Sequence, residues 1–171
     1  MIAVSRDFNA LLIPNAIPIK ILAGTEVEIT QYKGGNATVY FEGNLARVST
    51  KDLDAIGLEI DPHWNNIIKS NSKTDLTMIW EILKTCYDPE IPVNIVDLGL
   101  VYNCQIIEQK IIVSMTLTSP SCGMGPVIIE DIKEKLSNLP KINEVVVEVV
   151  FDPPWSTDRM SAIAKIELGI M

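Results

Sequence analysis

A cysteine that lies between a strand pattern and a helix pattern is the strongest candidate for chemistry in this sequence. Cys122 follows residues 111–118, in which apolar and polar side chains alternate, and precedes a helical pattern that begins at Gly125 or Pro126. A thiol at a helix N-terminus meets the positive end of the helix dipole and unpaired N–H groups, which favour the thiolate. Gly123 and Gly125 let the backbone approach a ligand closely. The sequence therefore predicts a functional thiol at Cys122, against the alternative of a buried cysteine that acts only as a small apolar side chain.

The neighbours that familiar thiol chemistries require are missing around this cysteine. A phosphatase loop needs arginine six residues after the cysteine, where this chain has Ile128, and a thioredoxin-type pair needs cysteine where it has Gly125. Zinc ribbons and self-contained ferredoxin clusters need several closely spaced cysteines. A cysteine hydrolase needs a histidine partner, and the single histidine, His63, lies in a polar stretch that is typical of a solvated linker. The thiol is therefore not expected to belong to one of these enzyme or metal-site types.

Two stiff loops carry further candidate residues. The first holds the carboxylates Asp88, Glu90 and Asp97 within ten residues, together with two prolines. These carboxylates either cap helices and turns, or form a polar wall beside the thiol that tunes its pKa or supplies oxygen ligands to iron. The second loop, residues 151–155, presents Trp155, for which packing is the first interpretation and contact with a partner protein the alternative.

Composition narrows the class of protein. The chain has 171 residues, 47% of them hydrophobic, and a formal net charge of −8, which disfavours nucleic acid and anionic membranes as partners. An odd number of widely spaced cysteines, three in all, does not fit a secreted disulfide framework. The apolar pieces at residues 10–13 and 19–22 are too interrupted for a signal peptide, and no apolar run approaches the roughly 18 residues of a membrane-spanning helix. We expect a cytoplasmic protein with reduced thiols.

The patterns divide the chain into a small N-terminal β-hairpin module (residues 1–60), a polar connector (61–73) and a compact α+β domain (74–171). In the module, alternating strands flank a turn at residues 32–36, and Ser49 or Thr50 is expected to cap a short helix that Gly57 ends. The domain is expected to hold a small mixed sheet packed by helices, with strands before and after the second helix paired in parallel. Its expected elements are a helix from Thr74 or Asp75 to Asp88, strands at 101–107 and 111–117, a helix from Gly125 or Pro126 to Leu139, a strand at 145–151 and a helix at 157–169.

The motifs of the α+β domain together resemble one known family. They are Asp88-Pro89-Glu90-Ile91-Pro92, Val96-Asp97-Leu98-Gly99-Leu100-Val101-Tyr102, Thr116-Leu117-Thr118 with Cys122-Gly123-Met124-Gly125-Pro126, Asp152-Pro153-Pro154-Trp155 and Arg159-Met160-Ser161. In this order they are similar to the SufT/PaaD-like iron–sulfur cluster assembly family. Many relatives have proline directly after the cysteine, where this chain has Gly123, which looks like the SufT variant. Residues 1–60 look like an N-terminal extension that distinguishes SufT proteins from shorter members.

The resemblance implies an auxiliary factor in iron–sulfur cluster assembly or transfer, and not an enzyme. It makes Cys122 the functional thiol and a tentative ligand of a transient cluster or of iron. It also places Asp88, Glu90, Asp97 and Thr118 as supporting polar residues, and leaves Trp155 and Arg159 as candidate partner contacts. The chain has no phosphate-binding G-x-x-x-x-G-K-[ST] loop, so no nucleotide is expected.

The implied partners are cluster assembly proteins and client apoproteins, while the oligomeric state stays open. Because one thiolate cannot fill the usual four-thiolate shell of a cluster, the remaining ligands would come from a second subunit, a partner or a free thiol. The alternatives are an adaptor that recruits clients without binding metal and, third, a thiol enzyme such as a redox sensor.

Overall fold

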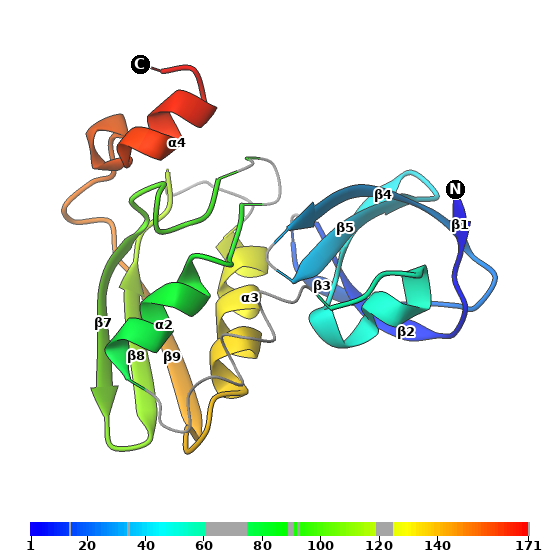
Figure 1. The fold of residues 1–171 in the computed structure, drawn as a ribbon, viewed down its shortest axis with the longest axis horizontal. Helices are drawn as coiled ribbons and strands as arrows, with labels where there is room; N and C mark the ends of the chain where they lie inside the picture. The colour runs from blue at the N-terminus through cyan, green and yellow to red at the C-terminus, as the bar shows by residue number, and fades with distance from the viewer. Residues whose placement is uncertain are drawn as a thin grey trace.

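The computed structural model describes residues 1–13, 15–33, 35–60, 75–88, 91, 93–118 and 125–170. The chain forms two units that lie side by side, a curled β module and an α+β domain (Figure 1). Each unit has its own cluster of buried apolar side chains. The two units therefore have separate cores.

The N-terminal module has more strands than the hairpin module expected from the sequence. Its strands form one six-stranded sheet in the order β1-β4-β5-β6-β2-β3, in which every pair is antiparallel. Three strands are additional: β1, which pairs with β4, and two strands that contain the apolar pieces near the N-terminus and pair with one another as a hairpin. The strands are β1 (Ile2–Ala3), β2 (Phe8–Leu12), β3 (Ile17–Ile21), β4 (Glu26–Lys33), β5 (Asn36–Phe41) and β6 (Asn44–Val48).

A short helix closes the module, with the caps that the sequence predicts. This helix, η1 (Thr50–Ile56), is a 3-10 helix, and the Ser49 side chain accepts a hydrogen bond from Lys51 N at its start. Gly57 ends it in the left-handed conformation, at φ +77°, which glycine adopts without steric cost. Leu53 and Ile56 point into the core of the module and are almost fully buried.

The α+β domain has the expected order of helix, strand, strand, helix, strand, helix. Its three-stranded sheet has the order β7-β8-β9, with β7 and β8 antiparallel and β8 and β9 parallel across α3. The parallel pairing expected from the strand–helix–strand pattern is confirmed. The elements are α2 (Leu76–Leu83), β7 (Val101–Ile107), β8 (Lys110–Met115), α3 (Gly125–Ser137), β9 (Glu144–Val149), the 3-10 helix η2 (Thr157–Arg159) and α4 (Ala162–Glu167).

The core of the domain lies between the sheet and helices α2 and α3. Alternation along β8 buries Ile111, Val113 and Met115 completely, as the period-two pattern predicts. From α3, Ile128 and Ile132 meet this face with helical spacing. The domain core therefore holds the start of α3 at a fixed position relative to the end of β8.

Two helices are shorter than their patterns predict. Asp75 caps α2 through Met78 N, as expected, but the helix ends at Leu83 and does not reach Asp88. Beyond it the backbone turns to pair with a later loop, since Ile95 N donates to Cys86 O and Tyr87 bridges Asn94.

The other shorter helix is the last one of the chain, which is divided in two. The single helix expected over residues 157–169 is the short η2 followed by α4, because the Ser161 side chain caps a new helix at Ala164 N. Within the described residues, no helix has the length and apolar character that crossing a membrane requires.

Candidate functional site at one end of the sheet

Described residues from several of the sequence motifs meet at one end of the domain's sheet, which we call the site end: the end where β7 begins and β8 and β9 finish. Val101 at the start of β7 pairs with Met115 at the end of β8, and Met115 in turn pairs with Val149 at the end of β9. Backbone bonds continue beyond the strands, from Thr116 N to Leu100 O. Loops far apart in sequence are thereby brought together at the site end, beneath α4 (Figure 1).

The acidic loop is fixed at the site end by its own hydrogen bonds. The Asp97 carboxylate accepts from Asn94 Nδ2 at 2.7 Å, and the Asn94 side chain accepts from Asp97 N at 2.9 Å. The Asp97 carbonyl accepts from Ser161 N at 2.8 Å, so the same residue also holds the start of α4. These bonds favour the turn-forming interpretation of Asp97. Its partner Asn94 has no role in the interpretation from sequence, although an Asn-x-x-Asp spacing is a signal of such a turn.

Of the other two carboxylates, the structure describes Asp88 but not Glu90. Asp88 is 5% exposed and follows directly on Tyr87, whose backbone bridges Asn94 of the acidic loop. The structure therefore brings the Asp88 and Asp97 segments together. Glu90 lies outside the described residues, so its expected role beside the thiol stays a prediction.

The segment that carries Cys122 leaves and returns at the site end. Thr118, which is exposed, is the last described residue after β8, and Gly125 is the first residue of α3, as the sequence predicts. These two ends lie close together, because a Cβ on Gly125 would come within 2.9 Å of the Leu117 side chain. Cys122 itself lies outside the described residues, three positions before α3, so its role as a thiol stays a prediction.

The C-terminal loop also packs on the site end. Trp155 is partly buried against the domain core, and its indole Nε1 donates to Leu98 O at 2.8 Å. Both features support a packing role for this ring, which is the first of the two interpretations from sequence.

Arg159 differs from Trp155, because its side chain is exposed. Its guanidinium lies 4.5 Å from the centre of the Tyr102 ring, and the Tyr102 hydroxyl donates to Pro153 O at 2.8 Å. Together with Val96, Gly99 and Val101 these side chains line a shallow cavity of about 320 Å³. Tyr102, like Asn94, has no role in the interpretation from sequence, and the signal for it is its place at the end of the second motif.

The two described thiols are held in the protonated form. Cys86 is fully buried, and burial, reinforced by the nearby Asp131 carboxylate, raises its pKa far above the ordinary value. Burial likewise raises the pKa of Cys104 to about 11. Near neutral pH both residues therefore stay mainly as thiols, which are poorer nucleophiles and metal ligands than thiolates. Among the described residues, no three His, Cys, Asp or Glu side chains come together in a way that would hold a metal ion.

Comparison with known proteins assigns the domain. Residues 76–149 match the model of a family described as iron–sulfur cluster assembly protein. The chain is 46% identical over 84 residues to the Fe-S protein maturation auxiliary factor SufT of Staphylococcus aureus. This match covers 48% of this chain and 96% of that protein. It is 44% identical over 89 residues to the auxiliary factor YitW of Bacillus subtilis, covering 52% of this chain and 87% of that protein. A Porphyromonas gingivalis protein of the same description is 43% identical over 94 residues, 54% of this chain and 90% of the relative.

The S. aureus relative bears on the N-terminal module. Because 84 aligned residues make up 96% of that SufT protein, it has no room for a counterpart of residues 1–60. The module is therefore not a general mark of SufT proteins, which corrects that part of the sequence interpretation.

Solved structures agree with the assignment of the domain. A domain of unknown function from Bacillus anthracis is 44% identical with a TM-score of 0.53, and the match covers 56% of this chain and 92% of that one. A conserved hypothetical protein from Thermotoga maritima is 36% identical with a TM-score of 0.51, covering 58% of this chain and 98% of that one. With near-complete coverage of relatives at 43–46% identity, this chain belongs to the SufT/PaaD-like family of iron–sulfur cluster assembly proteins.

Proposed function

We propose that this protein is an auxiliary factor that helps iron–sulfur clusters reach client apoproteins in the cytoplasm, as a carrier or adaptor and not as a catalyst. The observation that carries the proposal is the identity of 43–46% to three proteins named Fe-S protein maturation auxiliary factors, over 87–96% of their lengths. A protein named iron–sulfur cluster carrier protein from Synechocystis also matches, at 27% identity over 21% of its length. The partners are assembly proteins that load the cluster and clients that receive it.

In this proposal the Cys122 thiol is the group that meets the cargo. What supports this role is the start of α3 at Gly125, three residues further on, because free N–H groups at a helix start stabilise a thiolate nearby. The buried state of Cys86 and Cys104 also supports it, since it leaves Cys122 as the candidate thiol. One thiolate leaves most of the coordination shell of a cluster to other molecules, which suits a brief handover better than storage.

The adaptor without metal is the second candidate, and the stack of Arg159 on Tyr102 favours it. The side chain is exposed at the edge of a cavity of about 320 Å³, and its guanidinium is held over the ring at 4.5 Å. An exposed arginine that is already ordered loses little entropy on binding and is a common anchor in protein interfaces. In this version, client recruitment depends on Arg159 and Tyr102 and not on Cys122.

One experiment separates the two versions. Cells that lack the protein receive the wild-type chain, Cys122→Ser or Arg159→Ala, and the activity of an iron–sulfur client enzyme is measured together with its total amount. The carrier version predicts loss of client activity with Cys122→Ser, and loss of iron binding when the purified variant is titrated with Fe²⁺ and sulfide. The adaptor version predicts full activity with Cys122→Ser and a loss with Arg159→Ala. Normal client activity in cells without the protein would refute both.

A further inference from the structure

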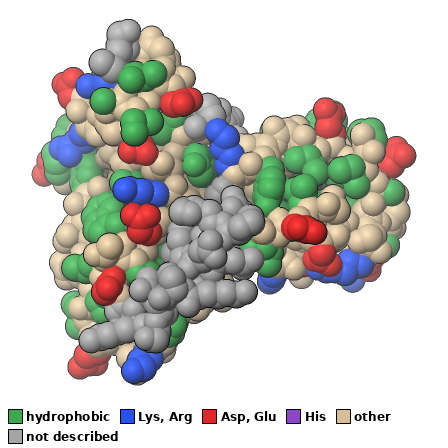
Figure 2. All heavy atoms as spheres, in the orientation of Figure 1, with side chains coloured by type: hydrophobic (Ala, Val, Ile, Leu, Met, Phe, Trp, Pro, Cys, Tyr) green, Lys and Arg blue, Asp and Glu red, His purple; other side chains and the backbone are tan. Residues whose placement is uncertain are grey.

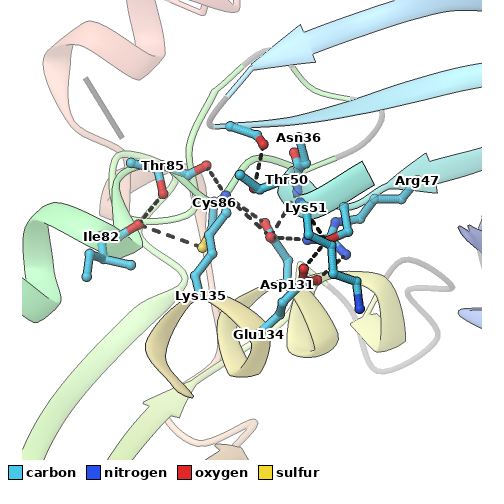
Figure 3. Close-up of polar contacts among 12 residues, drawn as sticks. Asn36, Arg47, Thr50, Lys51, Ile82, Thr85, Cys86, Asp131, Glu134 and Lys135 are labelled. Atoms are coloured by element: carbon cyan, nitrogen blue, oxygen red, sulfur yellow. Dashed lines mark hydrogen bonds and ion pairs between the residues drawn. The ribbon is translucent and has the colours of Figure 1, made fainter. Parts of the chain in front are cut away.

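A buried arginine of the N-terminal module is bound by the α+β domain. Arg47 on β6 is 6% exposed, and its guanidinium contacts two carboxylates of α3, with Nη1 at 3.2 Å from Glu134 and Nη2 on Asp131 (Figure 3). These carboxylates are three residues apart on the helix and so share one face. The two Nη groups of the guanidinium therefore bind both carboxylates at once, which fixes the orientation of Arg47 relative to α3.

The carboxylate of Asp131 is the centre of this contact. It accepts from Asn36 Nδ2 of β5 at 2.9 Å and pairs with Lys135 Nζ at 3.3 Å (Figure 3). Lys135, which is 1% exposed, also donates to Thr85 O at 2.7 Å. Arg47 and Lys135 bring two positive charges to the buried Asp131 and the partly exposed Glu134, and the module supplies one of the two.

Hydrogen bonds and ion pairs join the described residues of the module to α3. Besides Arg47 and Asn36, the Ser49 hydroxyl donates to the Glu134 carboxylate. The two apolar cores are separate clusters, and from the described part of the module only Ile13 packs against the core of the domain. A cleft of about 440 Å³ opens beside these contacts, between β2, β3 and α3, so apolar packing does not seal the joint.

We infer that the N-terminal module is a separable docking domain, and that the face of α3 bearing Asp131 and Glu134 is its binding surface. Buried ion pairs add little to stability when compared with apolar packing, but they fix one arrangement of two surfaces. Removing Arg47 costs much more, because the buried Asp131 carboxylate then loses its guanidinium partner and the partly exposed Glu134 carboxylate loses its ion pair. The module recognises this face by charge and covers it, and it lies beside the domain on a different side from α4 (Figure 1, Figure 2). The inference holds whether or not the protein carries clusters.

The test cuts the intact protein between its two units. A site for a specific protease is inserted within residues 61–74, which join the module to the domain in sequence. After cleavage, sedimentation velocity over a dilution series gives the dissociation constant of the two pieces. Wild-type pieces are expected to stay together at low micromolar concentration. Arg47→Met is expected to weaken their association at least about tenfold, because the buried Asp131 carboxylate loses the cation that the module supplies.

A matched control and a second interface variant keep the result clear. Arg6→Met removes an exposed arginine that pairs with Asp52 and Asp54 inside the module, and it is expected to leave the association unchanged. If Arg47→Met unfolds the module, as far-UV circular dichroism would reveal, Glu134→Gln on the other side of the contact replaces it. Combined with Arg47→Met where that variant folds, Glu134→Gln should cost less than the sum of the two single losses.

Two outcomes would overturn the inference. Wild-type pieces that separate at low micromolar concentration would show that the module is held only by its covalent link. Equal dissociation constants for the wild type and the variants at Arg47 or Glu134 would show that charge does not specify the docking.

Discussion

The backbone of Gly99 lies directly against that of Arg159, so closely that a Cβ on Gly99 would stand 2.4 Å from the Arg159 carbonyl oxygen. Gly99 also has φ +78°, in the region that favours glycine. This contact fastens the C-terminal loop to the acidic loop, and it explains why the second motif requires glycine at this position.

We expect Gly99→Ala to destabilise the domain, because the new methyl group meets backbone that cannot move aside cheaply. The loss should exceed about 1–3 kcal/mol, the usual cost of strained backbone alone. Urea denaturation followed by tryptophan fluorescence measures it. Gly169→Ala is the matched control, since Gly169 has φ +68° and open space around its Cβ position. Equal losses for the two variants would refute a role for the close approach.

The division into two units predicts that residues 75–171 fold alone. Their core is separate from that of the module, and relatives of about the length of this domain match it over 87–96% of their chains. Limited proteolysis should cut within residues 61–73 and leave a folded C-terminal fragment. The fragment should be less stable than the intact chain, because Asp131 loses Arg47. A fragment that unfolds once purified would contradict the two-unit division.

Local signals were enough to predict many of the elements. Capping by Asp75 and Ser49, the turn at 32–36 and the period-two pattern of β8 depend on neighbours within a few residues, and each appears as expected. The β2–β3 hairpin is not among the elements expected from sequence, because its two apolar pieces are short and were compared only with a signal peptide. Pro18 is compatible with this hairpin, since proline is tolerated in an edge strand and β3 is at the edge of its sheet.

The contact between the units could not be predicted from sequence. Arg47 and Asp131 are 84 residues apart, and charged residues on a helix such as α3 are usually typical of a solvated face. Lys135 is buried although it is charged, and its Nζ donates to Thr85 O, which lies 50 residues away in the sequence, so no local pattern encodes this contact either. The same holds for the candidate site. The motifs indicate which loops belong to it, but the pairing of Asp97 with Asn94 and of Arg159 with Tyr102 is seen only in the folded structure.

The raised pKa of Cys104 predicts a loss of stability in alkali. Burial raises this pKa from an ordinary value near 9.0 to about 11. The folded state therefore binds the proton more tightly, so the contribution is complete below about pH 9 and is lost as the pH rises toward 11. The stability of the wild type should fall relative to that of Cys104→Ala over this range. Urea midpoints measured at several pH values test this, and a constant difference between the two proteins would contradict it.

His63 is expected to have no part in the activity. It is the single histidine of the chain, it falls outside the described residues, and the largely polar connector around it, residues 61–73, suggests no catalytic partner. His63→Ala should leave client maturation unchanged. Lost activity in a variant of normal stability would revive the enzyme that pairs cysteine with histidine.

Cys122 is expected to be the most reactive of the three thiols. Burial holds Cys86 and Cys104 as thiols, with the pKa of Cys104 raised to about 11 and that of Cys86 raised further. Cys122 precedes the start of α3 by three residues, where helix N–H groups favour the thiolate. A limiting amount of iodoacetamide near neutral pH, followed by peptide mapping, should therefore label Cys122 first.

Replacement by serine then tests what this reactivity is for. Serine keeps nearly the same volume, so Cys122→Ser should fold as the wild type does while cluster delivery to client enzymes falls. Cys104→Ser is the matched control, and it should leave delivery unchanged because its thiol stays protonated and buried at neutral pH. Earlier labelling of Cys86 or Cys104, or full delivery by Cys122→Ser, would contradict the thiol mechanism. The adaptor version, which depends on Arg159 and Tyr102, would then take its place because it requires no thiolate.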